Sequence, residues 1–89
     1  MKTRYLELTF RKGKPIAAYL YLPRKTGVKS VKTTTAAPGI LVDFAAGGVP
    51  IGLEITVPGK TTAAQVNEVL KSLGLTPMES SELSPLEAA

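Results

Sequence analysis

The sequence predicts a small α+β domain, in which about five antiparallel strands form a meander-like sheet and one C-terminal amphipathic helix packs on one face. Three observations support this prediction. Several segments alternate apolar and polar residues, as half-buried strands do. One later segment places its apolar residues at helical spacing. At 89 residues the chain has room for a single compact core, and 44% apolar residues suffice to build one.

Two alternating segments near the N-terminus, "YLELTF" and "IAAYLYL", predict a first hairpin. The segment "RKGKP" between them is a short turn with Gly13 as its flexible point. If Phe10 lies opposite Ile16, then Tyr5 lies opposite Tyr21, and one face of the hairpin is continuously apolar.

Three more strands are expected in the middle of the chain. Lys29–Thr35 is rich in threonine and could form a strand, although Val31 is its only strongly apolar residue. Ile40–Phe44 and Val49–Val57 predict a second hairpin. Gly47–Gly48 would supply the positive φ angles that its turn requires, and no phosphate loop is indicated because no helix follows them.

Alternation also predicts a register for this second hairpin. Placing Phe44 opposite Val49 sets Asp43 opposite Pro50, with Glu54 four residues further along its strand. At about 3.3 Å per residue the two carboxylates are then about 13 Å apart, too far to act together as a glycosidase-type pair. Because Pro50 lacks an N–H group, we expect its strand at an edge of the sheet, or the proline at a position that the ladder does not bond.

Gly52, inside the same strand, has two interpretations. A neighbouring side chain such as Leu41 folds across the bare glycine, or a bulge lies there. Alternatively, the missing side chain lets a ligand approach the backbone closely. Packing is the interpretation that we favour.

Thr62–Leu73 is the one clear helix of the sequence. Thr62 and Gln65 form a capping box of the S/T-x-x-Q type. Its apolar residues form a single stripe, which needs the apolar face of the sheet as its partner. Gly74 is well placed as the left-handed residue that ends the helix, with Leu75 as the apolar contact after it.

Residues 76–89 form a tail with two helix-start signals, "TPME" and "SPLE". They predict a short helix near Pro77–Leu83 and a frayed end. The chain is accordingly divided into one α+β domain over residues 1–75 and a C-terminal tail over residues 76–89.

Composition argues against several classes of function. The chain has no cysteine and no histidine, so it lacks thiolate ligands, disulfides and the commonest neutral-pH base. We therefore expect no cofactor and no metal site, and an enzyme is disfavoured. No apolar run reaches a membrane-spanning length. Arg4 and Glu7 interrupt the segment where an export signal would need an apolar core, so a cytoplasmic location and no membrane partner are expected.

Charge is distributed unevenly along the chain. Residues 1–35 contain nine Lys and Arg but one acid, whereas residues 36–89 contain two Lys and six acids. This asymmetry suggests a nucleic-acid-binding accessory protein that uses the basic loops 11–14 and 24–32. In a meander, however, those loops lie at opposite ends of the sheet, and a continuous footprint is not formed.

Three tyrosines, Tyr5, Tyr19 and Tyr21, fall on the outward face of the first hairpin, close to Arg24 and Lys25. They have three interpretations. Aromatic rings with basic neighbours can stack single-stranded bases. Tyrosine is also favoured at dimer interfaces. The third is that outward tyrosines simply suit strands and are partly covered by the tail.

The stretch "APGILVDFAAGGVPIGLEI" resembles the hallmark of a family of small bacterial proteins catalogued as domain of unknown function 2283. The matching positions are Pro38, Gly39, Val42, Asp43, Phe44, Gly48, Gly52, Glu54 and Ile55. "AAYLYL" is similar to an earlier family segment, with Tyr19 at the family's tyrosine, so the resemblance covers roughly residues 10–57. It implies the hairpin fold and no established activity. Where the family's two turns are usually acidic, this chain has Ala45, Ala46 and Gly47 in one and "RKGKP" in the other.

Taken together, these features predict a non-enzymatic interaction module that self-associates as a homo-oligomer or binds a small protein partner. An edge strand or the tyrosine face would provide the contact. The nucleic-acid-binding accessory protein is the alternative.

Overall fold

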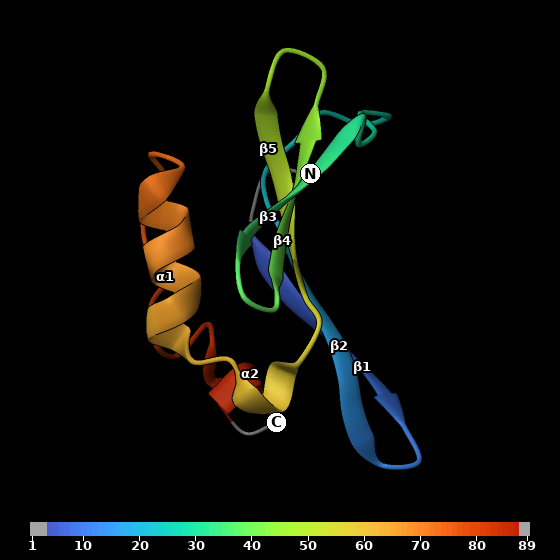
Figure 1. The fold of residues 1–89 in the computed structure, drawn as a ribbon, viewed down its shortest axis with the longest axis vertical. Helices are drawn as coiled ribbons and strands as arrows, with labels where there is room; N and C mark the ends of the chain where they lie inside the picture. Colours follow the sequence, from blue (N-terminus) through green and yellow to red (C-terminus); the bar gives the residue numbers. More distant parts are fainter. Residues whose placement is uncertain (1–3, 88–89) are drawn as a thin grey trace.

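The computed structural model describes residues 4–87 and has the predicted α+β architecture. Its five strands form one antiparallel sheet in the order β1-β2-β5-β4-β3 (Figure 1). The strands are β1 (Tyr5–Arg11), β2 (Lys14–Tyr21), β3 (Lys32–Ala37), β4 (Ile40–Ala45) and β5 (Val49–Ile55). A 3₁₀ turn η1 (Pro58–Lys60) and two helices, α1 (Ala63–Ser72) and α2 (Ser84–Glu87), follow them.

The strand order differs from the simple meander that the sequence predicted. β2 lies beside β5 rather than β3, and β3 forms the far edge of the sheet. Burial explains this order. β5 contributes Ile51, Leu53 and Ile55, which are almost wholly buried in the centre, whereas residues 32–36 of β3 are all exposed. A threonine-rich strand with few apolar side chains belongs at an edge.

The first hairpin has the predicted register over most of its length, with Tyr5 opposite Tyr21. Near the turn a register shift follows Thr9, so Phe10 lies opposite Pro15 and not opposite Ile16 as predicted. A bulge adds one residue to one strand of a pair and does not change the composition of either strand. The alternation of apolar and polar residues therefore gives no sign of it.

The register predicted for the second hairpin is wrong by two residues from Ile40 to Asp43, where Asp43 pairs with Gly52 rather than Pro50. Beyond the register shift that follows Asp43 it is wrong by one residue, because Ala45 rather than Phe44 pairs with Val49. From Ile40 to Asp43 the shift by two keeps every residue on its face, so the apolar pattern cannot distinguish the two registers there. Turn geometry decides between them. Gly47 and Gly48 both have positive φ, and the Gly48 N–H donates to the Ala45 carbonyl, which closes a tight turn.

Of the two placements predicted for Pro50, an edge strand or a position that the ladder does not bond, the structure rules out the edge strand. β5 is a central strand, paired with β2 on one side and β4 on the other. Pro50 lies opposite Phe44, immediately beside the register shift that follows Asp43. An irregularity in the ladder is one of the few places where a central strand accepts a residue without an N–H group.

Helix α1 begins and ends as its sequence predicts. The Thr62 hydroxyl accepts from the Gln65 N–H while the Gln65 side chain accepts from the Thr62 N–H, which completes the capping box. At the other end the N–H groups of Gly74 and Leu75 donate to the carbonyls of Lys71 and Leu70. Gly74 has a φ of 75°, so this end is a Schellman motif. No helix within residues 4–87 is long and apolar enough to cross a bilayer.

The hydrophobic core lies between one face of the sheet and the C-terminal segments. The buried cluster comprises Ala18, Leu20, Leu22, Ile40, Val42, Leu53, Ile55, Val66, Val69, Leu70, Met78, Leu83 and Leu86. It therefore joins the inward side chains of β2, β4 and β5 to the stripe of α1, as expected. We call the opposite side of the sheet the outward face.

The described part of the tail packs into this same core. Met78, Leu83 and Leu86 are buried members of the cluster. The Asn67 side chain of α1 accepts from the Met78 N–H and donates to its carbonyl, which fixes the tail against the helix. The short helix predicted near Pro77–Leu83 is not formed; turns lead instead into α2.

Candidate functional site

The predicted tyrosines meet on the outward face of the sheet, and we call Tyr5, Tyr19 and Tyr21 the tyrosine cluster. Tyr5 and Tyr21, a directly opposed pair, stack with ring centroids 4.5 Å apart. Tyr19 meets Tyr21 edge-on, with centroids 4.7 Å apart. Offset stacking and edge-to-face contact are the arrangements that aromatic rings prefer. Strand pairing thus turns three separate tyrosines into one continuous aromatic surface.

Of the two cations predicted to join this surface, Arg24 reaches it. Its guanidinium carbon lies 5.7 Å from the centroid of the Tyr21 ring, within cation–π distance. Lys25 instead lines a neighbouring hollow of about 270 Å³, together with Arg24 and apolar side chains that include Val49 and Ile51. Loop 22–31 therefore brings positive charge to one side of the tyrosine cluster.

Asp43 holds Tyr19 in place through a hydrogen bond from β4. The Tyr19 hydroxyl donates to Asp43 Oδ2 at 2.7 Å, and the Thr33 hydroxyl donates to Oδ1 at 2.6 Å. One carboxylate thereby links side chains from β2, β3 and β4. Burial raises the pKa of Tyr19 well above its ordinary value, and the hydrogen bond to Asp43 and its negative charge raise it further. Tyr19 is consequently a fixed, neutral hydroxyl donor.

Gly52 makes this contact across β5 sterically feasible. Tyr19 on β2 must cross β5 to reach Asp43 on β4, and Gly52 lies opposite Asp43. A Cβ atom at Gly52 would overlap the hydroxyl and ring carbons of Tyr19. The glycine is thus covered by a side chain, as expected, but that side chain is Tyr19 and not Leu41.

Tyr21 has a carboxylate partner of its own. Its hydroxyl donates to Glu7 Oε1 at 3.1 Å, and this hydrogen bond is the main reason that the pKa of Tyr21 is raised. Sequence reasoning missed Glu7 and Thr33 as parts of this surface. The register of the first hairpin contained the signal for Glu7, since it sets Glu7 opposite Tyr19 and diagonal to Tyr21.

The remaining positions of the predicted signature have separate roles. Gly39 has a φ of 77°, and its carbonyl accepts from the Thr56 N–H. Gly48 belongs to the turn between β4 and β5. Glu54 lies between Leu41 on β4 and Tyr19 on β2. The structure therefore brings Asp43 and Gly52 into the tyrosine cluster and leaves Gly39 and Gly48 at turns.

The observed register also changes the spacing of the two carboxylates. Glu54 lies two residues beyond the partner of Asp43, and such diagonal neighbours are about 7–8 Å apart instead of the 13 Å predicted. Both oxygens of Asp43 nevertheless accept hydrogen bonds from structural hydroxyls. The geometry gives Asp43 the role of a bridge between strands, and we assign no reaction to the pair.

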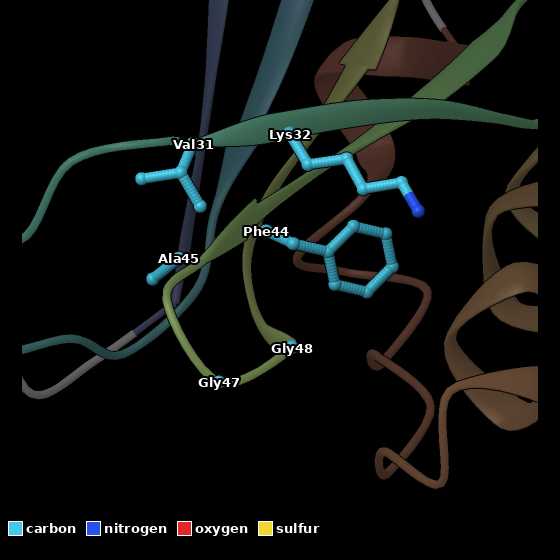
Figure 2. A pocket seen from close by; sticks show the side chains of 6 residues that line it. All are labelled: Val31, Lys32, Phe44, Ala45, Gly47 and Gly48. Carbon is cyan, nitrogen blue, oxygen red and sulfur yellow. The ribbon is translucent and has the colours of Figure 1, made fainter.

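A hollow of about 280 Å³ lies beside the turn of the second hairpin (Figure 2). It is lined by Val31, Lys32, Phe44, Ala45, Gly47 and Gly48. Figure 2 shows Phe44 and Lys32 extending in the same direction from neighbouring strands. Among the described residues of this lining, Lys32 is the only ionisable side chain.

The described tail does not cover the tyrosine cluster, because its buried side chains lie in the core on the other face. Tyr5 keeps 44% of its surface exposed. The basic loops lie at opposite ends of the sheet, as predicted (Figure 1). No protein-family model, curated protein or solved structure matches the chain.

Proposed function

We propose that this protein is a non-enzymatic interaction module that self-associates through its tyrosine cluster. The observation that carries the proposal is a continuous aromatic surface that is fixed in shape and still exposed: Tyr5 stacks on Tyr21 and keeps 44% of its surface open. Tyrosine is enriched in the energetic centres of interfaces, where a ring supplies apolar area and its hydroxyl a polar contact.

The hydrogen bonds beneath the cluster favour association. Asp43 fixes Tyr19, and Glu7 fixes Tyr21, before any partner arrives. Side chains that are already ordered lose less entropy on binding, about 0.5–1.5 kcal/mol less for each immobilised side chain. Arg24 at one side of the cluster supplies the polar rim that interfaces usually have.

The β3 edge of the sheet is a second contact that fits the same function. Within residues 4–87, β3 pairs on one side only, with β4. Its residues 32–36 are exposed and contain one charge and no proline. An edge of this kind is a template on which another strand can add. A second copy of the chain could therefore extend the sheet through β3.

Light scattering after size-exclusion chromatography tests the proposal. We expect a concentration-dependent dimer, and a strict monomer at high micromolar concentration would contradict it. Tyr5→Ser should weaken the dimer about 30-fold or more, because truncation of an interface hot spot costs about 2 kcal/mol or more. Phe10→Ser is the matched control, since it removes an even more exposed ring from the same strand outside the cluster.

A further variant separates the two surfaces. Thr34→Lys adds a charge to the exposed edge strand without touching the tyrosine cluster. Lysine on an edge discourages strand addition. A dimer that resists Tyr5→Ser and is lost with Thr34→Lys would reassign self-association to β3 and overturn the tyrosine contact.

We also propose that the chain is a divergent relative of domain of unknown function 2283. Structural roles for Asp43 and Gly52 support the resemblance, because both residues are needed to seat Tyr19. A crystal structure of a member of that family tests this. Its tyrosine should cross the corresponding glycine to reach the corresponding aspartate, and another arrangement would argue against kinship.

A further inference from the structure

The β1–β2 hairpin ends in a projecting tip (Figure 1), formed by residues 10–16, that we call the arm. Two large apolar residues of the arm lie in solvent: Phe10 is 58% exposed and Ile16 is 48% exposed. Arg11, Lys12 and Lys14 between them are exposed as well. The sequence from residue 8 to residue 18 contains no acid. The arm therefore combines a positively charged turn with two exposed apolar side chains behind it, one on each strand.

Lys12 occupies a backbone conformation that lysine does not favour. Its φ is 52°, and that of Gly13 is 78°, so the two residues form the left-handed pair of a tight hairpin turn. Asparagine or aspartate is the usual residue before glycine in such a turn. A cation stands here although the local backbone prefers another residue, and unfavourable conformations of this kind concentrate at functional sites.

The three cations of the arm remain available to a partner. Within residues 4–87, no ion pair involves Arg11, Lys12 or Lys14. The ion pair that is formed, between Lys71 and Glu68, lies on α1. The complementary partner is a polyanion. The other basic loop lies at the far end of the sheet, so the arm must make this contact by itself (Figure 1).

We propose that the arm inserts into the minor groove of duplex DNA, with its cations on phosphates and Phe10 and Ile16 as apolar wedges. Proteins that read DNA with β-strands use the minor groove as well as the major groove. Phenylalanine and isoleucine are among the side chains that partly unstack base steps from the minor groove. Duplex RNA fits less well, because its minor groove is wide and shallow. Recruitment to acidic membranes usually relies on four to eight basic residues, more than the arm has.

Fluorescence anisotropy with a short labelled duplex tests this proposal. Three phosphate contacts predict that the logarithm of the affinity falls with the logarithm of salt concentration with a slope of about −2.7 for each arm engaged. The affinity should then drop about 40-fold between 50 and 200 mM salt. Duplex RNA of the same sequence should bind more weakly.

Lys12→Asn is the most informative variant, because asparagine removes the charge and suits the turn, so the fold is retained. We expect the slope to become shallower by about 0.9. Lys29→Gln is the control, since it removes an exposed charge from the opposite end of the sheet and should leave the slope unchanged. Phe10→Ser should weaken binding without altering the slope, because it removes the wedge and no charge.

Two results would overturn the proposal. One is DNA binding that Lys12→Asn, Lys14→Gln and Phe10→Ser all leave at the wild-type level. The other is binding of the arm to acidic phosphatidylserine vesicles with no binding to duplex DNA at low salt, which would assign the arm to membranes. Both measurements can be made with the Tyr5→Ser variant, which weakens the tyrosine contact and leaves the arm intact. Neither result therefore depends on self-association.

Discussion

Gly52 matters because the space above it is filled by the Tyr19 ring. The glycine lies on a central strand between a tyrosine donor and an aspartate acceptor. A strand usually loses stability when it contains glycine. Here the bare backbone lets Tyr19 reach Asp43, and the hydrogen bond so formed connects strands that are not neighbours in the sheet.

We expect Gly52→Ala to lower the free energy of unfolding by about 1–3 kcal/mol, because the new methyl group overlaps Tyr19 and forces its ring away from Asp43. Urea denaturation measures the change. In a Tyr19→Ala background the same substitution should cost much less, since nothing remains for the methyl group to displace. Equal costs in the two backgrounds would show that Tyr19 is not the obstacle.

Alkaline pH should weaken the fold through Tyr19. Its pKa is raised above the ordinary 10.0 in the folded chain, so the folded state holds this proton more tightly than the unfolded state. The contribution is fully present below pH 10 and is lost as pH rises further. Unfolding free energies measured across this range should fall more steeply for the wild type than for Tyr19→Phe. Parallel curves would contradict the assignment.

At the scale of single elements, Gly74 ends helix α1 in a left-handed conformation. Gly74→Ala should cost about 1 kcal/mol, because alanine resists a φ of 75° and the Schellman hydrogen bonds depend on that conformation. Gly74→Asn should cost less, since asparagine tolerates the left-handed region. Thermal unfolding of both variants measures the difference, and equal losses would rule out backbone conformation as the cause.

Local signals predicted the elements better than they predicted the pairing between them. The capping box of Thr62 and Gln65 and the glycine after α1 appear in the structure as expected, because both depend on residues close in sequence. The register of the second hairpin does not, since a shift by two residues preserves the alternation. The position of β3 at the far edge depends on which strands bury the most apolar surface. That comparison involves all five strands and cannot be made from any single segment.

The candidate surface was partly predictable for the same reason. Alternation placed Tyr5, Tyr19 and Tyr21 on one face, and the structure confirms their proximity. The hydrogen bond from Tyr19 to Asp43 crosses β5, which is separated from β2 in the sequence by β3 and β4. A contact of that kind requires the sheet order, which the expected meander did not provide.

At the scale of the whole molecule, the tail is part of the core. Leu83 is fully buried and touches the same cluster as Leu70 of α1. Leu83→Ala should therefore lower the free energy of unfolding by about 2–5 kcal/mol, a cost similar to that of Leu70→Ala. Ser81→Ala, at an exposed position of the same turn, is the control. Denaturant unfolding measures these free energies. A cost near zero for Leu83→Ala would show that the tail does not contribute to the stability of the core.

The sheet order has a consequence for how the chain reaches its fold. β1–β2 and β3–β4–β5 are two local units, each built from strands that follow one another in sequence. They join along one seam, where residues 18–21 pair with residues 52–55. Closing that seam brings together segments more than 30 residues apart, and such non-local pairing is slower than hairpin formation. The tyrosine cluster lies within one unit, but the bond from Tyr19 to Asp43 crosses the seam. Tyr19 thus reports whether the two local units have joined along this seam.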